Sequence, residues 1–171
     1  NIAKEIKRVG YKPKLFGYTD TTWDPRYLDD NDKKKYTYES PMEGFDPICH
    51  LPESNPEPWY KYLLSKGYKY KNAKQLYKRD FPKKGEAFTY KAWSIKAEDS
   101  DTSFLADQVI KHLKNKTDPF FYHVSFLRPH PPRFVSEPWH SLIDPSKIKI
   151  PSNSLTYKKM LLGHPFLKEI A

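Results

Sequence analysis

The hydrophobic and polar positions near the start of the chain follow a helical pattern and then a strand pattern. Residues 2–10 place three apolar side chains at i, i+4 and i+7 on one helical face and end at Gly10, a residue typical of a left-handed helix C-cap. Residues 14–18 form a short apolar run after a proline, which predicts a buried strand.

A second helix and strand are predicted further along the chain. Residues 100–114 carry the clearest amphipathic pattern, and Ser100 or Asp101 can cap the N-terminus, where an acidic side chain suits the helix dipole. The apolar run 120–127 follows and predicts a strand buried on both faces. A helix, a short turn and a buried strand form half of a βαβ unit. The sequence therefore predicts an α/β fold in which helices cover both faces of the sheet.

Weaker patterns fill the rest of the chain. Residues 59–64 and 72–78 are two short helical candidates separated at Gly67, and the alternation over residues 88–95 predicts another strand. Residues 27–57 show little periodicity and contain four prolines, so they are expected to form a long irregular loop or insertion.

Composition excludes several classes of protein. The 171 residues include 13 Tyr, 10 Phe and 4 Trp, too many aromatic side chains for a disordered chain. The single cysteine excludes an internal disulfide framework and a cysteine-based zinc site. No window approaches 18 consecutive apolar residues, so a membrane-spanning helix is not expected. One cysteine does not settle the compartment.

The charge is strongly basic, with 30 Lys and Arg against 21 Asp and Glu and a net charge of +9. Such a balance is found in nucleic-acid-binding proteins. The lysines are, however, scattered along the chain, and no helix-turn-helix, zinc finger or aromatic RNA-binding motif accompanies them. A solvated surface explains this charge better than nucleic-acid binding, which stays an alternative.

Two polar clusters directly follow the two best strands, residues 18–22 and residues 128–132. Ligands of α/β sheets bind at the carboxyl ends of the strands. Prolines around His130 restrict its backbone, so the imidazole either donates to an anionic ester and protonates a leaving group, or simply fills a proline-rich turn. The hydroxyl groups beginning at Tyr18 either bind oxygens of a sulfate or phosphate or cap a local turn. The residues alone leave both alternatives open.

Other reactive side chains lack partners in the sequence. Cys49 has no matching base nearby and is expected to be a buried or idle thiol. The six histidines show no spacing typical of metal ligands, so no metal site is predicted within the chain.

Three segments together resemble the sulfatase family. The first contains Leu-Phe-Gly-Tyr-Thr-Asp-Thr-Thr over residues 15–22 and Asp-Pro-Arg over residues 24–26, and it is similar to the phosphonate monoester hydrolase branch in carrying Tyr and Thr. Residues 99–107 resemble the family's next helix. Residues 120–134 resemble the strand that ends in a substrate-binding histidine.

This resemblance implies an alkaline-phosphatase-like fold, with a parallel or mixed sheet, and hydrolysis of sulfate, phosphate or phosphonate esters. His130 matches the histidine that contacts the ester, which implies a catalytic and substrate-binding role. The substrate-binding positions of the other segment fall on Tyr18, Thr19, Asp20 and Thr21. An aspartate at position 20 repels a bare anion unless a metal ion or a proton intervenes.

The resemblance also implies a formylglycine nucleophile, made from Cys or Ser in a Cys/Ser-x-Pro/Ala-x-Arg motif, and a divalent cation held by carboxylates. Neither motif is present, and Cys49 lacks the arginine that the motif requires. We therefore expect residues 1–171 to be one partial domain, inactive alone, whose partners are the rest of a parent polypeptide and a small anionic ester. A stand-alone basic domain that binds polyanions, or a structural domain without a pocket, are the alternatives.

Overall fold

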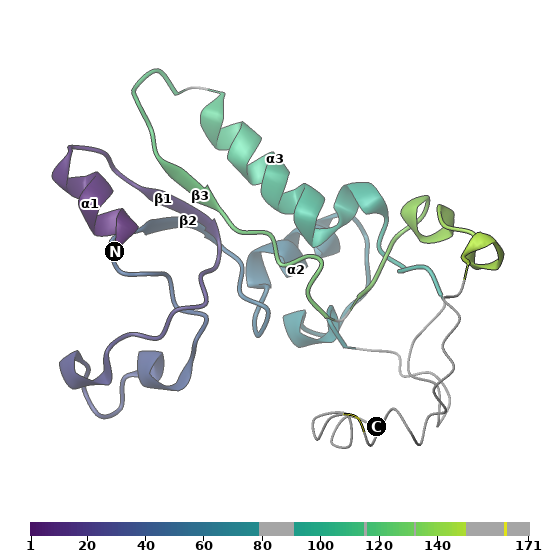
Figure 1. Cartoon of the computed structure of the whole chain (residues 1–171), viewed down its shortest axis with the longest axis horizontal. Coiled ribbons are helices and arrows are strands. Elements are labelled where there is room, and N and C mark those ends of the chain that lie inside the picture. Colours follow the sequence, from purple (N-terminus) through teal and green to yellow (C-terminus); the bar gives the residue numbers. More distant parts are fainter. Residues whose placement is uncertain (79–90, 115, 132, 150–162, 164–171) are drawn as a thin grey trace. The chain divides into compact units, whose positions relative to one another are not determined.

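The computed structural model describes residues 1–78, 91–114, 116–131, 133–149 and 163 (Figure 1). Within this part of the chain, no helix is long and apolar enough to cross a membrane.

The chain divides into two compact units. The first unit, Asn1–Ser141, contains the sheet, its helices and the candidate site. In the second unit, Leu142–Ala171, the described residues include a short 3-10 turn at Pro145–Lys147, capped by the side chain of Asp144.

A three-stranded parallel sheet forms the centre of the first unit. Strand β1 (Lys14–Gly17) lies between β2 (Asp46–His50) and β3 (Tyr122–Val124), as Figure 1 shows. Both neighbours run parallel to β1. This sheet and the helices beside it confirm the predicted α/β class.

Three helices accompany the sheet, α1 (Ile2–Arg8), α2 (Glu57–Ser65) and α3 (Asp101–Leu113). The predicted cap of α3 is confirmed, because the Ser100 hydroxyl accepts a hydrogen bond from the Ser103 amide at 3.2 Å. Such a cap contributes about 1 kcal/mol of stability to a helix. A helix is present in each of three segments predicted to be helical, residues 2–10, 59–64 and 100–114.

The central strand sends alternate side chains into two separate cores. Leu15 packs in a small cluster with Ala3 of α1 and Phe45. Phe16 points into the larger core, whose buried members from the helices are Trp59, Leu63, Phe104 and Leu105. Both β1 side chains are fully buried, and each such burial contributes roughly 1.5–3 kcal/mol. The helices therefore cover both faces of the sheet, as the pattern predicts.

Gly17 ends β1 in a conformation that other residues rarely adopt. Its φ is +95°, and an added Cβ would collide with the backbone carbonyl of Ser125. The Ser125 amide in turn donates to the Phe16 carbonyl at 2.8 Å. The close approach of these two backbones requires glycine, and it sets the direction in which the chain leaves β1 toward Tyr18.

The strand predicted over residues 120–127 is shorter and more exposed than expected. Regular pairing is limited to Tyr122–Val124, and the prediction that it is buried on both faces is wrong, since Phe120 and Phe126 are 50% and 45% exposed. Within the described sheet β3 pairs with β1 alone, so its outer side has no neighbouring strand to cover it.

Residues 27–57 are not irregular throughout. They contain β2 and a 3-10 turn at Lys33–Tyr36, although most of the segment is loop. The sequence pattern missed β2 because Pro47 lies inside it. The register of β2 against β1 shifts between Leu15 and Phe16, and proline is tolerated at such irregular or edge positions.

Two other predicted elements differ from the structure. The helix expected over residues 72–78 is only a 3-10 turn, Ala73–Gln75. In the strand expected over residues 88–95, residues 88–90 lie outside the described part, and residues 91–95 form no strand. Ile95 is fully buried in the core here, so the alternation reflects side-chain burial without strand pairing.

Candidate functional site

The carboxyl ends of the three parallel strands bring the predicted site segments to one edge of the sheet. Tyr18 follows β1 directly and is buried. Burial, then the nearby carboxylates of Asp20, Glu39 and Glu53, raise the pKa of Tyr18 to about 12. The phenol therefore stays protonated at neutral pH and is available as a hydrogen-bond donor. No described residue hydrogen-bonds to its hydroxyl.

The three residues after Tyr18 differ in their surroundings. The buried Thr19 hydroxyl donates to the Ser40 carbonyl at 2.8 Å and accepts from the Met42 amide at 2.8 Å. Its single proton is therefore used inside the fold, where it ties the end of β1 to residues 40–42. Asp20 is exposed, and Thr21 is partly buried. Both remain available to a ligand approaching from solvent.

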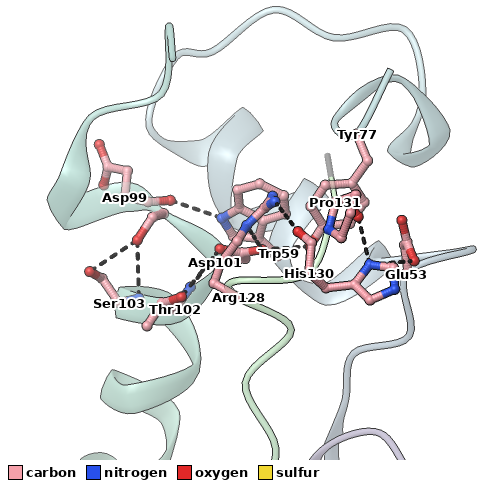
Figure 2. Close-up of polar contacts among 11 residues, drawn as sticks. Glu53, Trp59, Tyr77, Asp99, Asp101, Thr102, Ser103, Arg128, His130 and Pro131 are labelled. Carbon is pink, nitrogen blue, oxygen red and sulfur yellow. Dashed lines mark hydrogen bonds and ion pairs between the residues drawn. The ribbon is translucent and has the colours of Figure 1, made fainter. Parts of the chain in front are cut away.

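His130 lies in the loop that follows β3, with its imidazole between two oxygen acceptors (Figure 2). The Nδ1 atom is 2.6 Å from the Pro131 carbonyl oxygen and 3.6 Å from Oε2 of Glu53. The His130 amide donates to the Leu127 carbonyl at 3.0 Å, which closes the turn. The side chain is 55% exposed, so a substrate can reach the ring.

Arg128, two residues before His130, is held in an aromatic cage. Its guanidinium carbon lies 5.2 Å from the centre of the Tyr77 ring, 5.1 Å from Trp93 and 5.9 Å from Phe134. Its Nε atom is 3.3 Å from the carboxylate of Asp101, the first residue of α3. The two charged side chains are only 16% and 3% exposed, so this ion pair is well shielded from solvent.

This cage connects the start of α3 to the loop of His130. The Tyr77 hydroxyl donates to Asp101 Oδ2 at 2.8 Å, the carboxylate oxygen that also faces Arg128 Nε. Burial and the charge of Asp101 raise the pKa of Tyr77. Arg128 Nη1 donates to the His130 carbonyl at 3.3 Å, as Figure 2 shows. One guanidinium thus joins the helix and the loop.

The two segments share one neighbour, Glu53. Its carboxylate contributes to the raised pKa of Tyr18 and stands beside the His130 ring. The geometry therefore brings a phenol donor, an imidazole and a carboxylate to the same edge of the sheet.

Sequence reasoning placed Arg128 in the polar cluster 128–132 without giving it a role, and it missed Glu53. Arg128 lies within the segment that resembles sulfatases, two positions before His130, and that proximity was the available signal. Glu53 follows β2, which the pattern did not predict, so nothing in the sequence placed it near His130.

The described residues do not provide a metal centre. They contain no group of three or more His, Cys, Asp and Glu side chains that could hold an ion. Cys49 is buried in the core, and burial raises the pKa of its thiol to about 11. At neutral pH the group is a neutral thiol, which agrees with the prediction of an idle cysteine.

Comparison with known proteins relates this α/β fold to the alkaline phosphatase superfamily. No family model matches the chain. It is 28% identical over 170 residues to the multifunctional alkaline phosphatase superfamily protein PehA of Trinickia caryophylli, covering 98% of this chain and 33% of that protein.

Solved structures agree with this assignment. The phosphonate monoester hydrolase SpPMH from Silicibacter pomeroyi superimposes with a TM-score of 0.84 at 36% identity, over 98% of this chain and 33% of that one. The phosphonate monoester hydrolase of Agrobacterium radiobacter superimposes with a TM-score of 0.83 at 34% identity, over 99% of this chain and 33% of that one. The chain is a homologue of these alkaline phosphatase superfamily members and spans about a third of their length.

Proposed function

We propose that this chain forms one side of the active site of a hydrolase that cleaves small anionic phosphonate, phosphate or sulfate esters. The observation that carries the proposal is that Tyr18 and His130 follow adjacent parallel strands, at whose carboxyl ends α/β sheets bind ligands. Homology to phosphonate monoester hydrolases supports the reaction class.

Tyr18 binds the ester. Its protonated hydroxyl donates a hydrogen bond to a non-bridging oxygen, and the raised pKa keeps that proton in place at neutral and mildly alkaline pH. Thr21 adds a second hydroxyl close by in sequence, and Thr19 holds the turn through its bonds to residues 40 and 42. The Asp20 carboxylate favours an ester whose charge is partly neutralised, because a bare anion is repelled.

His130 acts on the leaving group. As the bond between phosphorus or sulfur and the ester oxygen breaks, the electron pair stays on that oxygen, and the imidazolium donates its proton there. The exposed ring at the edge of the sheet is compatible with this role.

The nucleophile and the cation of such a reaction are not supplied by the described residues. The isolated chain is therefore expected to show no turnover of aryl sulfates, phosphonate monoesters or phosphodiesters. Metal-dependent turnover by the chain alone would contradict this assignment.

The substitution His130→Ala in the full-length protein tests the role of the imidazole. We expect kcat/KM for an aryl phosphonate monoester to fall by roughly 10²-fold or more, the usual size of general acid catalysis. His140→Ala is the matched control, since His140 is a nearby histidine that pairs with Glu137 at 3.4 Å in its own turn. An unchanged kcat/KM in His130→Ala would remove this residue from the site.

A further inference from the structure

The backbone on both sides of Glu53 is attached to the ends of other elements. Before it, the Leu51 amide donates to the Gly17 carbonyl at 3.0 Å. After it, the Ser54 amide lies 3.2 Å from both carboxylate oxygens of the buried Glu39. The backbone around Glu53 is therefore fixed by hydrogen bonds to the end of β1 and to the Glu39 side chain.

The Glu53 carboxylate is directed toward the His130 ring. It is 27% exposed, and no described residue donates a hydrogen bond to it. Its charge contributes to the raised pKa values of Tyr18 and Tyr77. Arg128 and Asp101, also at this edge, form an ion pair with each other.

Two acceptors face the same nitrogen of His130. The Pro131 carbonyl, 2.6 Å away, accepts a hydrogen bond from Nδ1, and the Glu53 carboxylate, 3.6 Å away, adds a negative charge on the same edge of the ring. An imidazole whose Nδ1 faces oxygen acceptors keeps its proton there. A carboxylate in such a place holds the orientation and the tautomer of a catalytic histidine.

We propose that Glu53 is the positioning residue of His130: together with the Pro131 carbonyl it keeps a proton on Nδ1, so that Nε2 is the nitrogen that exchanges a proton with the ester. This inference rests on the proposed function of His130. In the acid step Nε2 gives its proton to the leaving oxygen, and the ring is left neutral with its hydrogen on Nδ1. Water returns the proton to Nε2 before the next turnover.

The test replaces Glu53 with glutamine and with aspartate in the full-length protein. Nitrogen-15 NMR of labelled histidine, with His130→Asn to assign the signal, reports which ring nitrogen carries the proton. We expect the native neutral ring to be protonated on Nδ1. In Glu53→Gln we expect the fraction protonated on Nε2 to increase, because Gln retains the size of Glu but not its charge. Glu53→Asp retains the charge, so its fraction protonated on Nε2 should lie between those of the native protein and Glu53→Gln.

Kinetics provide a second readout. We expect kcat of Glu53→Gln to fall roughly tenfold, with KM changed by less than about twofold and the melting temperature unchanged, because the effect is on alignment of the reacting proton. The matched control is Glu57→Gln, which removes a carboxylate that is also 3.6 Å from its charged partner, Lys61, but lies in α2. The control should leave kcat and the NMR signal of His130 unchanged.

The outcomes separate this inference from the proposed function. A Glu53→Gln protein with the native nitrogen-15 signal and native kcat would overturn the role of Glu53, even if His130→Ala is inactive. Full activity of His130→Ala would overturn the proposed function, while the NMR comparison would still decide whether Glu53 controls the ring. A native ring protonated on Nε2 would also refute the inference.

Discussion

The two segments that carry Tyr18 and His130 are held by different kinds of interaction. Residues 17–21 follow the central strand, and backbone packing, a glycine and a buried threonine hydroxyl keep them in place. Residues 128–131 follow β3 at the side of the described sheet, and one guanidinium in an aromatic cage ties them to α3.

This difference indicates how each segment can fail. The first segment has no room for a Cβ at Gly17, so an added atom there must move the backbone. The second segment is joined to α3 through the Arg128 side chain, so losing that chain weakens the attachment of the loop. Substitutions in the two segments should therefore affect stability and activity in different proportions.

The largest effect is expected for Gly17→Ala. The added Cβ collides with the Ser125 carbonyl, and the φ of +95° is strained for alanine. Together these should lower the free energy of unfolding by about 3–5 kcal/mol, measured by urea denaturation. Gly10→Ala is the matched control, because Gly10 has a φ of +89° but open space around it. A similar loss in both variants would show that the close approach to Ser125 is unimportant.

The second largest effect is expected for Arg128→Met. It leaves the buried Asp101 carboxylate without its cation, and we expect a loss of about 2–3 kcal/mol of stability and a larger relative loss of kcat/KM. Arg26→Met breaks a solvent-exposed ion pair with Asp24 and should leave stability essentially unchanged. Arg128→Lys keeps the charge without the planar fork and should restore only part of the activity. Equal stability of the two methionine variants would contradict the cage's role.

Tyr18→Phe separates chemistry from folding in the first segment. The change removes one hydroxyl with no described partner, so stability should change by less than about 1 kcal/mol. The loss of a donor to the ester should lower kcat/KM by on the order of 10²-fold. Tyr27→Phe, at an 83% exposed position, is the control and should be fully active. Native kinetics in Tyr18→Phe would refute its role in binding.

The smallest effect concerns alkaline pH. Cys49 of β2 lies beside Phe16 of β1, and burial raises its thiol pKa from 9.0 to about 11. Between these values the unfolded chain loses the proton and the folded chain keeps it, so stability falls as pH rises. At pH 10 the loss of stability that is due to Cys49 should be about 1 kcal/mol. Cys49→Ala should therefore lose less stability than the native protein between pH 8 and pH 10; an identical decrease would contradict this.

The sequence predicts those parts of the fold that depend on neighbouring residues. The cap and apolar stripe of α3, the apolar run of β1 and Gly10 at the end of α1 are local signals, and each appears in the structure. Strand β2 was not predicted because its pairing with β1 joins residues more than 30 positions apart, and a proline inside it obscures the local pattern.

The candidate site is only partly visible in the sequence for the same reason. Tyr18 and His130 stand directly after predicted strands, so parallel pairing was enough to place them at one edge. The cage of Arg128 requires three rings from distant segments and the first residue of α3. No local sequence pattern encodes contacts among segments so far apart. The position of Glu53 depends in addition on β2, which the sequence does not predict.

The aromatic cage has a consequence for how the loop of His130 responds to pH. Arginine does not give up its proton within the pH range in which proteins stay folded. Its hold on the His130 carbonyl therefore outlasts any titration at the reacting groups. The side chain that orients the loop therefore has no titratable switch of its own.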